Sequence, residues 1–155
     1  MKLSHLVLAA SVLALPAACA TTAGDGPGMT AAVSSDATLQ ETASLMASIT
    51  QHGDGVDIAD SSAQLDAQIA AAPNDPYVLK LAALSRVSLS DSSQDRAERV
   101  KLRHDALAQY DKAISLAKPD APSRIVRLNG QETEIDLKDL PDLRAQLFHT
   151  VQTDR

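Results

Sequence analysis

The sequence predicts a mainly α protein, a small bundle of helical hairpins followed by a β-hairpin and a closing helix. Composition is the first reason: of 155 residues, 45% are hydrophobic but only 2% are aromatic, so the core must be aliphatic and rich in alanine. Between Asn74 and Lys118, apolar residues recur at three- and four-residue steps, the spacing of amphipathic helices. Nearer the C-terminus, Asn129-Gly130 separates two short strand-like runs, which predicts a hairpin.

The first 20 residues have the features of an export signal peptide. Lys2 precedes an apolar run from Leu6 to Leu15 that only Ser11 interrupts, and small residues follow. A run of this length is too short to span a bilayer, which takes about 20 residues. Residues 1–20 are therefore excluded from the folded domain.

The only cysteine in the sequence, Cys19, lies at the end of this signal. A single cysteine excludes an internal disulfide. The run Leu15-Pro16-Ala17-Ala18-Cys19 resembles the lipobox of bacterial lipoproteins, although Pro16 stands where that motif has an aliphatic residue. The resemblance implies that Cys19 becomes a lipidated N-terminus and that Ala20 after it directs the protein to the outer membrane. The alternative is cleavage after Ala20, which removes Cys19 and releases a soluble periplasmic protein.

The remaining chain divides into a tether and one domain. Residues 21–35 are rich in Gly, Ser, Thr and Ala without periodicity, which predicts a flexible tether between an anchor and the domain. Residues 36–155 are expected to form a single α-helical domain, with a small hairpin-helix element at 123–152.

Four helices are expected before the hairpin, with the approximate bounds Ala37–Gln51, Ser61–Ala72, Pro76–Leu89 and Ser93–Ala117. Polar side chains just before each helix accept hydrogen bonds from its first turn, and the predicted N-caps are Asp36, Asp60, Asp75, and Asp91 or Ser92. Pro76 suits the first position of the third helix, because its missing N–H costs nothing there. Gly53 and Pro73 are expected to end the first two helices.

The C-terminal part is expected to combine two strands with one helix. A two-residue turn at Asn129-Gly130 pairs Arg127 with Glu132 across the hairpin. Because an isolated hairpin is only marginally stable, a last helix from about Pro141 to Val151 is expected to cover it. The outer edge of Arg124–Leu128 is expected to be exposed and able to accept a strand from a partner.

The helical centre resembles the tetratricopeptide repeat family over about residues 61–119. Ala106-x-x-x-Tyr110-x-x-Ala113, followed by Pro119, resembles the second helix of such a repeat, and Asn74-Asp75-Pro76 resembles the opening of a first helix. Pro73 and Pro119 are 46 positions apart, however, and the repeat period is about 34. The alternative is an unrelated alanine-rich bundle, which produces the same small and aromatic steps by packing alone.

The repeat resemblance implies a concave surface that holds a peptide or a partner helix. Tyr77 and Tyr110 are the large amphipathic side chains of this region, so they are candidate binding residues. His104, within the apolar stripe of the fourth helix, is a further candidate, although a half-buried structural histidine explains it as well. The cluster His52, Asp54, Asp57 and Asp60 has the ligand types of a divalent-cation site, but its spacing does not match a calcium-binding loop. A turn and an N-cap explain these residues, and no metal site or cofactor is predicted.

The sequence predicts no catalytic residues. It has no G-x-S-x-G, H-E-x-x-H or phosphate-binding glycine loop, and the net charge of −6 argues against nucleic acid. The predicted function is that of a non-enzymatic periplasmic interaction or scaffold protein, lipid-anchored to the outer membrane through Cys19, whose partner is another envelope protein or peptide. The alternatives are a structural subunit of an envelope assembly and, with less support, a periplasmic enzyme.

Overall fold

The computed structural model describes the backbone of residues 27–153 and the side chains of residues 35–53 and 55–153. The predicted signal peptide, with Cys19, lies outside these residues. In chain order the described elements are α1 (Pro27–His52), the 3-10 turn η1 (Gly53–Gly55), α2 (Ile58–Ala71), α3 (Pro76–Ser92), α4 (Arg96–Leu116), β1 (Arg124–Leu128), β2 (Gln131–Ile135) and α5 (Leu140–Thr153). The protein is mainly α-helical, with an antiparallel hairpin followed by a closing C-terminal helix, and this predicted fold class is confirmed.

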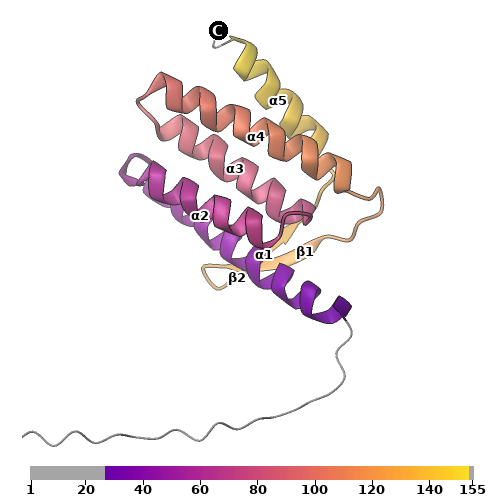
Figure 1. Ribbon diagram of the computed structural model, residues 1–155. Coiled ribbons are helices and arrows are strands. Elements are labelled where there is room, and N and C mark those ends of the chain that lie inside the picture. The colour runs from indigo at the N-terminus through magenta and orange to yellow at the C-terminus, as the bar shows by residue number, and fades with distance from the viewer. Residues whose placement is uncertain (1–26, 154–155) are drawn as a thin grey trace, which may run out of the picture.

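Helix α3 is the centre of the bundle. Consecutive helices run antiparallel, α3 lies between α4 and the α1–α2 pair, and α5 lies on the far side of α4 (Figure 1). Eleven of the 17 residues of α3 are buried, on all sides of the helix. Leu79, Leu81 and Ala83 join an aliphatic core cluster to which α1, α4, α5 and both strands contribute buried residues. A second cluster contains Ile49, Leu65, Ala82, Leu89 and Leu102.

Two of the predicted helix boundaries are confirmed by the geometry of the chain. The Asp75 side chain caps α3, accepting hydrogen bonds from the backbone N–H groups of Tyr77 (2.9 Å) and Val78 (3.4 Å). Gly53 follows the end of α1 with a φ of 48°, a conformation that glycine adopts without the steric cost other residues bear.

The start of α1 differs from the prediction. The helix begins at Pro27 rather than near Ala37, so residues 27–35 of the expected tether are helical, whereas residues 21–26 lie outside the described part of the chain. Proline is favoured in the first turn of a helix, and the alanines that follow it are strong helix formers. Asp36 therefore lies inside α1 and does not cap it.

The predicted N-caps of α2 and α4 are also wrong, by a few residues each. Asp57 caps α2 by accepting from the N–H of Asp60 (3.0 Å), so Asp60 belongs to the first turn. Asp95 caps α4 by accepting from the N–H of Ala97 (2.9 Å). Ser93 instead ends α3, because its N–H bonds back to Leu89, so α4 cannot begin until the chain has turned.

The predicted hairpin register is confirmed. Arg127 pairs with Glu132, and their side chains form an ion pair of 3.3 Å. Asn129 and Gly130 have φ values of 52° and 80°, which the two-residue turn requires. Val126 and Ile135 point into the core, whereas the side chains of the opposite face are exposed.

The position of α5 corrects the expectation that it covers the hairpin. It packs along α4 through Leu140, Leu147 and Val151, whereas β1 packs against α1 (Figure 1). The link into α5 is held by Lys80 of α3, whose Nζ donates to the carbonyl of Asp136 (2.7 Å) and to the carboxylate of Asp139 (2.5 Å). None of the helices in the described part of the chain is long and apolar enough to cross a membrane.

Candidate interaction groove

A groove of about 200 Å³ lies between α3, α4 and α5. Its apolar lining comes from all three helices: Leu84, Val87, Tyr110, Leu143 and Leu147. Its polar lining is Asp91, Arg103, Gln146 and Thr150. We call this site the α3–α5 groove.

The groove forms because α3 and α5 both pack on α4, and side chains of all three helices line the space between them. Leu84 and Val87 of α3 and Leu143 of α5 pack against the core, yet each stays half-buried, because no further element of the described part of the chain covers them. Tyr110 of α4 lies between them and is only 1% exposed. The result is a short strip of accessible aliphatic side chains over a rigid aromatic residue.

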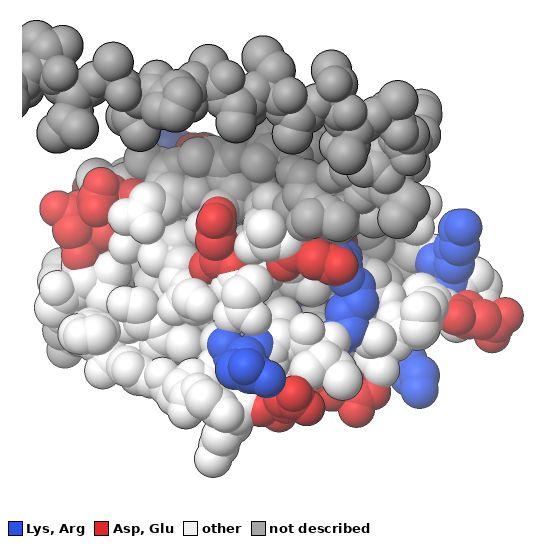
Figure 2. All heavy atoms as spheres, turned by 90° about the horizontal axis from the view of Figure 1, so that it is seen from below, with Lys and Arg blue, Asp and Glu red and all other residues white. Residues whose placement is uncertain are grey.

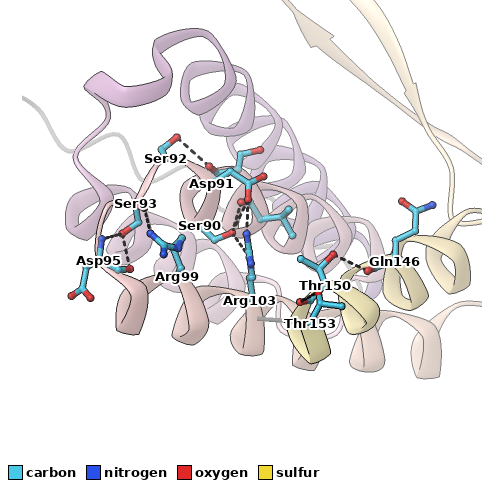
Figure 3. A network of polar contacts seen from close by, with 12 residues as sticks. Ser90, Asp91, Ser92, Ser93, Asp95, Arg99, Arg103, Gln146, Thr150 and Thr153 are labelled. Atoms are coloured by element: carbon cyan, nitrogen blue, oxygen red, sulfur yellow. Dashed lines mark hydrogen bonds and ion pairs between the residues drawn. The ribbon is translucent and has the colours of Figure 1, made fainter. Parts of the chain in front are cut away.

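One end of the groove is charged and ordered. Arg103 donates from Nη2 to the carboxylate of Asp91 (3.0 Å) and from Nε to the hydroxyl of Ser90 (3.1 Å), as Figure 3 shows. Gln146 and Thr150 lie nearby on α5, where the Thr150 hydroxyl donates to the Gln146 carbonyl (3.1 Å). The α3–α4 corner thus fixes the guanidinium of Arg103 and leaves the Asp91 side chain 63% exposed.

The hydroxyl of Tyr110 is strongly affected by the burial of this side chain. Burial, and to a smaller extent the carboxylate of Asp139, raises the pKa of its hydroxyl above the ordinary value. The hydroxyl therefore stays protonated at neutral pH. Tyr110 supplies shape and apolar surface to the α3–α5 groove.

A second cavity, of about 400 Å³, lies at the α2–α3 turn and contains Tyr77. Here Arg124 of β1 bonds the buried carboxylate of Asp75 (2.5 Å) and also that of Asp36 on α1. Its guanidinium lies 5.1 Å from the centre of the Tyr77 ring, and the Tyr77 hydroxyl donates to the carbonyl of Pro122. These polar groups satisfy one another, so the cluster ties α1, α3 and β1 together.

The electrostatics of this cluster agree with a structural role. Burial would lower the pKa of Arg124, but its hydrogen bonds and ion pairs with Asp36 and Asp75 raise it overall, so its charge is permanent. Burial raises the pKa of Tyr77, and the positive charge of Arg124 opposes that shift. Neither group titrates near neutral pH.

The three predicted binding residues do not lie together. Tyr110 lines the α3–α5 groove, Tyr77 lines the cavity at the α2–α3 turn, and His104 is exposed on α4 and lines neither. The expectation that His104 is half-buried in the apolar stripe is wrong, because His104 is exposed and the buried face of α4 is formed by other residues, among them Leu102 and Ala106.

The sequence analysis missed most residues of the groove. Leu84, Val87 and Leu143 read as ordinary core positions, and only the packing of α5 on α4 brings them together as the wall of a groove. For metal binding, no group of three or more His, Cys, Asp or Glu residues comes together where side chains are described. In the cluster around His52, Asp57 caps α2, and the side chain of Asp54 lies outside the described ones.

Charges of both signs are mixed on the face of the molecule that Figure 2 shows. On the face seen in Figure 2, Lys and Arg side chains lie next to Asp and Glu among the residues drawn in colour. A nucleic-acid site needs a continuous basic surface, and this coloured area has none.

Comparisons with protein-family models, with curated proteins and with solved structures found no match to this chain. The tetratricopeptide resemblance therefore stays a prediction.

Proposed function

We propose that the protein is a non-enzymatic interaction protein of the bacterial cell envelope. Its α3–α5 groove would hold an apolar side chain, presented by a peptide or helix of another envelope protein. The observation that carries the proposal is the groove itself, in which half-buried aliphatic residues surround Tyr110 beside an ordered polar end.

The size of the groove favours a peptide anchor over a small metabolite. Pockets for whole small molecules usually measure about 300–1,000 Å³. The 200 Å³ available here has room for only one or two apolar side chains. Interfaces of this kind place an apolar anchor in a pocket and surround it with a polar rim. Asp91 and Gln146 are in position to form that rim.

The proposed location rests on residues 1–20 of the sequence, with their apolar run and the lipobox-like end at Cys19. An outer-membrane lipid anchor would concentrate the domain at a membrane surface. Mass spectrometry of the mature protein tests this. We expect an N-terminal Cys19 carrying acyl chains, and Cys19→Ala should shift the protein from the membrane to the soluble fraction. A mature chain that begins at Thr21 would overturn the lipid anchor but keep the periplasmic location.

Site-specific photo-crosslinking in intact cells tests the groove. A photoreactive amino acid replaces Leu143 in one variant and Leu84 in another. The matched control replaces Ala67, which is exposed on α2 away from the groove. We expect a protein adduct of one discrete mass from both groove positions and none from position 67. Adducts of the same mass from all three positions, or none from the groove, would contradict the proposal.

A charge introduced into the groove supplies an independent readout. Leu143→Asp should remove the adduct formed at position 84, because a carboxylate opposes the entry of an apolar side chain. The purified variant should keep the helical circular dichroism of the original protein, since Leu143 is only half-buried.

A further inference from the structure

The two outer edges of the hairpin differ in whether another described element forms hydrogen bonds to the backbone there. On β1, the side-chain amide of Gln40 in α1 takes both backbone groups of Arg127. Gln40 Nε2 donates to the Arg127 carbonyl (2.7 Å), and the Arg127 N–H donates to Gln40 Oε1 (2.8 Å). This pair of bonds imitates one rung of a neighbouring strand. The expectation that the edge of Arg124–Leu128 is free for a partner is therefore wrong at Arg127.

The register shows which backbone groups face outward on β2. Leu128 and Gln131 close the two-residue turn, so that pair and every second pair after it bond to each other. The intervening pairs, Arg127 with Glu132 and Ile125 with Glu134, direct their N–H and C=O groups away from the hairpin. The Gln40 bonds to Arg127 confirm this alternation on β1. On β2, the outward groups therefore belong to Glu132 and Glu134.

Within residues 27–153, no group outside the hairpin bonds to the backbone of Glu132 or Glu134, and this open edge of β2 is acidic. Glu132 and Glu134 are both exposed, and the Glu132 carboxylate forms an ion pair with the Arg127 guanidinium (Nη2–Oε1 distance 3.3 Å). Glu134 lies opposite Ile125, which is 67% exposed, and its carboxylate accepts a hydrogen bond from the Ser123 hydroxyl. No basic residue is paired with Glu134 across the sheet.

We propose that the edge of β2 binds an extended segment of another protein that carries Lys or Arg two residues apart. Such a segment adds a third strand through the backbone groups of Glu132 and Glu134. Its alternate basic side chains lie beside the two carboxylates, because residues i and i+2 of a strand share one face. The proposal is independent of the α3–α5 groove.

A second copy of this chain does not fit the same edge. Antiparallel pairing of two β2 strands about Thr133 would place Glu132 of each copy opposite Glu134 of the other. Like charges directly across a sheet are destabilising. Charge complementarity therefore assigns the edge to a basic partner.

The test uses a synthetic peptide probe of alternating Lys and Val with blocked ends. We expect it to bind the protein at least tenfold more tightly than a peptide of the same length that has Glu in place of Lys. Amide NMR should place the largest shifts at Glu132 and Glu134, and both amides should gain protection from hydrogen exchange. No preference between the peptides, or shifts centred elsewhere, would overturn the proposal.

Two variants separate strand addition from charge attraction. Glu134→Pro removes an outward N–H together with the Glu134 carboxylate, without touching the bonds to β1, so it should abolish binding, a larger loss than removal of the carboxylate charges alone. The double variant Glu132→Gln with Glu134→Gln keeps every backbone group, so it should keep the fold and weaken binding at least fivefold. Asp60→Asn is the matched charge control and should leave affinity unchanged. If the double variant binds the peptide as tightly as the original protein does, the assignment to a basic partner is overturned. It is also overturned if the original protein forms a dimer that Glu134→Pro dissociates, because the edge would then bind a second copy of the chain.

Discussion

Helices α3 and α5 belong to the same bundle but have opposite roles in it. Eleven of 17 residues in α3 are buried, against three of 14 in α5. Helix α3 is contacted by α1, α2 and α4, so nearly all its sides are core, whereas among the described helices α5 packs mainly against α4. The difference indicates that α3 contributes most to the stability of the domain and that the exposed surface of α5 is available for recognition.

The central position of α3 also shows in its charged residues, two of which are buried. Lys80 and Arg86 are each only 6% exposed, which is unusual for cations. Both reach acidic partners at the rim of the bundle: Lys80 bonds Asp139, and Arg86 bonds Asp66 on α2. Their stems fill the core while their charges link α3 to neighbouring segments.

The largest effect is expected from truncating the core of α3. Leu81 is 1% exposed, so Leu81→Ala should lower the free energy of unfolding by about 2–5 kcal/mol through lost burial and the cavity left behind. Leu143→Ala removes the same atoms from the half-buried groove and should cost about 1 kcal/mol or less. Urea unfolding of both variants measures the difference. Equal losses would remove the distinction between α3 and α5.

The buried ammonium of Lys80 is the next test. Lys80→Met keeps the apolar stem but loses the hydrogen bonds to Asp136 and Asp139, so it should cost about 1–3 kcal/mol. Asp139 is half exposed and rehydrates, which keeps the loss near the lower end. The exposed control Lys101→Met should change stability by less than about 0.5 kcal/mol. A Lys80→Met protein as stable as the original would show that this bridge does not hold the β2–α5 link.

Tyr110 predicts how stability changes at alkaline pH. Because burial raises its pKa in the folded protein, the unfolded chain releases this proton first, near pH 10. The stability it contributes is complete below that pH and is lost as the pH rises toward the folded value. Between pH 10 and 11, Tyr110→Phe should reduce the fall in stability by up to about 1.4 kcal/mol per pH unit. If the unfolding free energy of the two proteins falls equally steeply with pH, the Tyr110 hydroxyl does not have the raised pKa that burial gives it.

The smallest effect on stability is expected at the edge of β1. Gln40→Ala removes two partly exposed hydrogen bonds to Arg127 and should cost about 1 kcal/mol. Amide exchange at Arg127 should accelerate, because its N–H loses its acceptor. Glu41→Ala, on the next position of α1, is the control. Unchanged exchange at Arg127 in the Gln40 variant would show that the side-chain amide does not close the edge.

The sequence predicts which helices and strands form better than it predicts where they end or which of them pack together. Strong local signals were sufficient at Asp75-Pro76 and at Asn129-Gly130, where one residue pair dictates the backbone. The caps of α2 and α4 were misplaced because several Asp and Ser residues compete there, and tertiary packing selects one. The groove was not predictable, because Leu84 and Leu143 are 59 positions apart and meet only once α5 has packed on α4.

Hydrogen exchange along the chain most directly tests the central claim that α3 is the stable centre and α5 the accessible margin. Mass spectrometry of the exchanging protein under native conditions measures both helices in one experiment. We expect the amides of α3 to be the slowest in the domain, exchanging only through global unfolding. Those of α5 should exchange at least tenfold faster, through local opening. Protection in α5 equal to that in α3 would contradict the account.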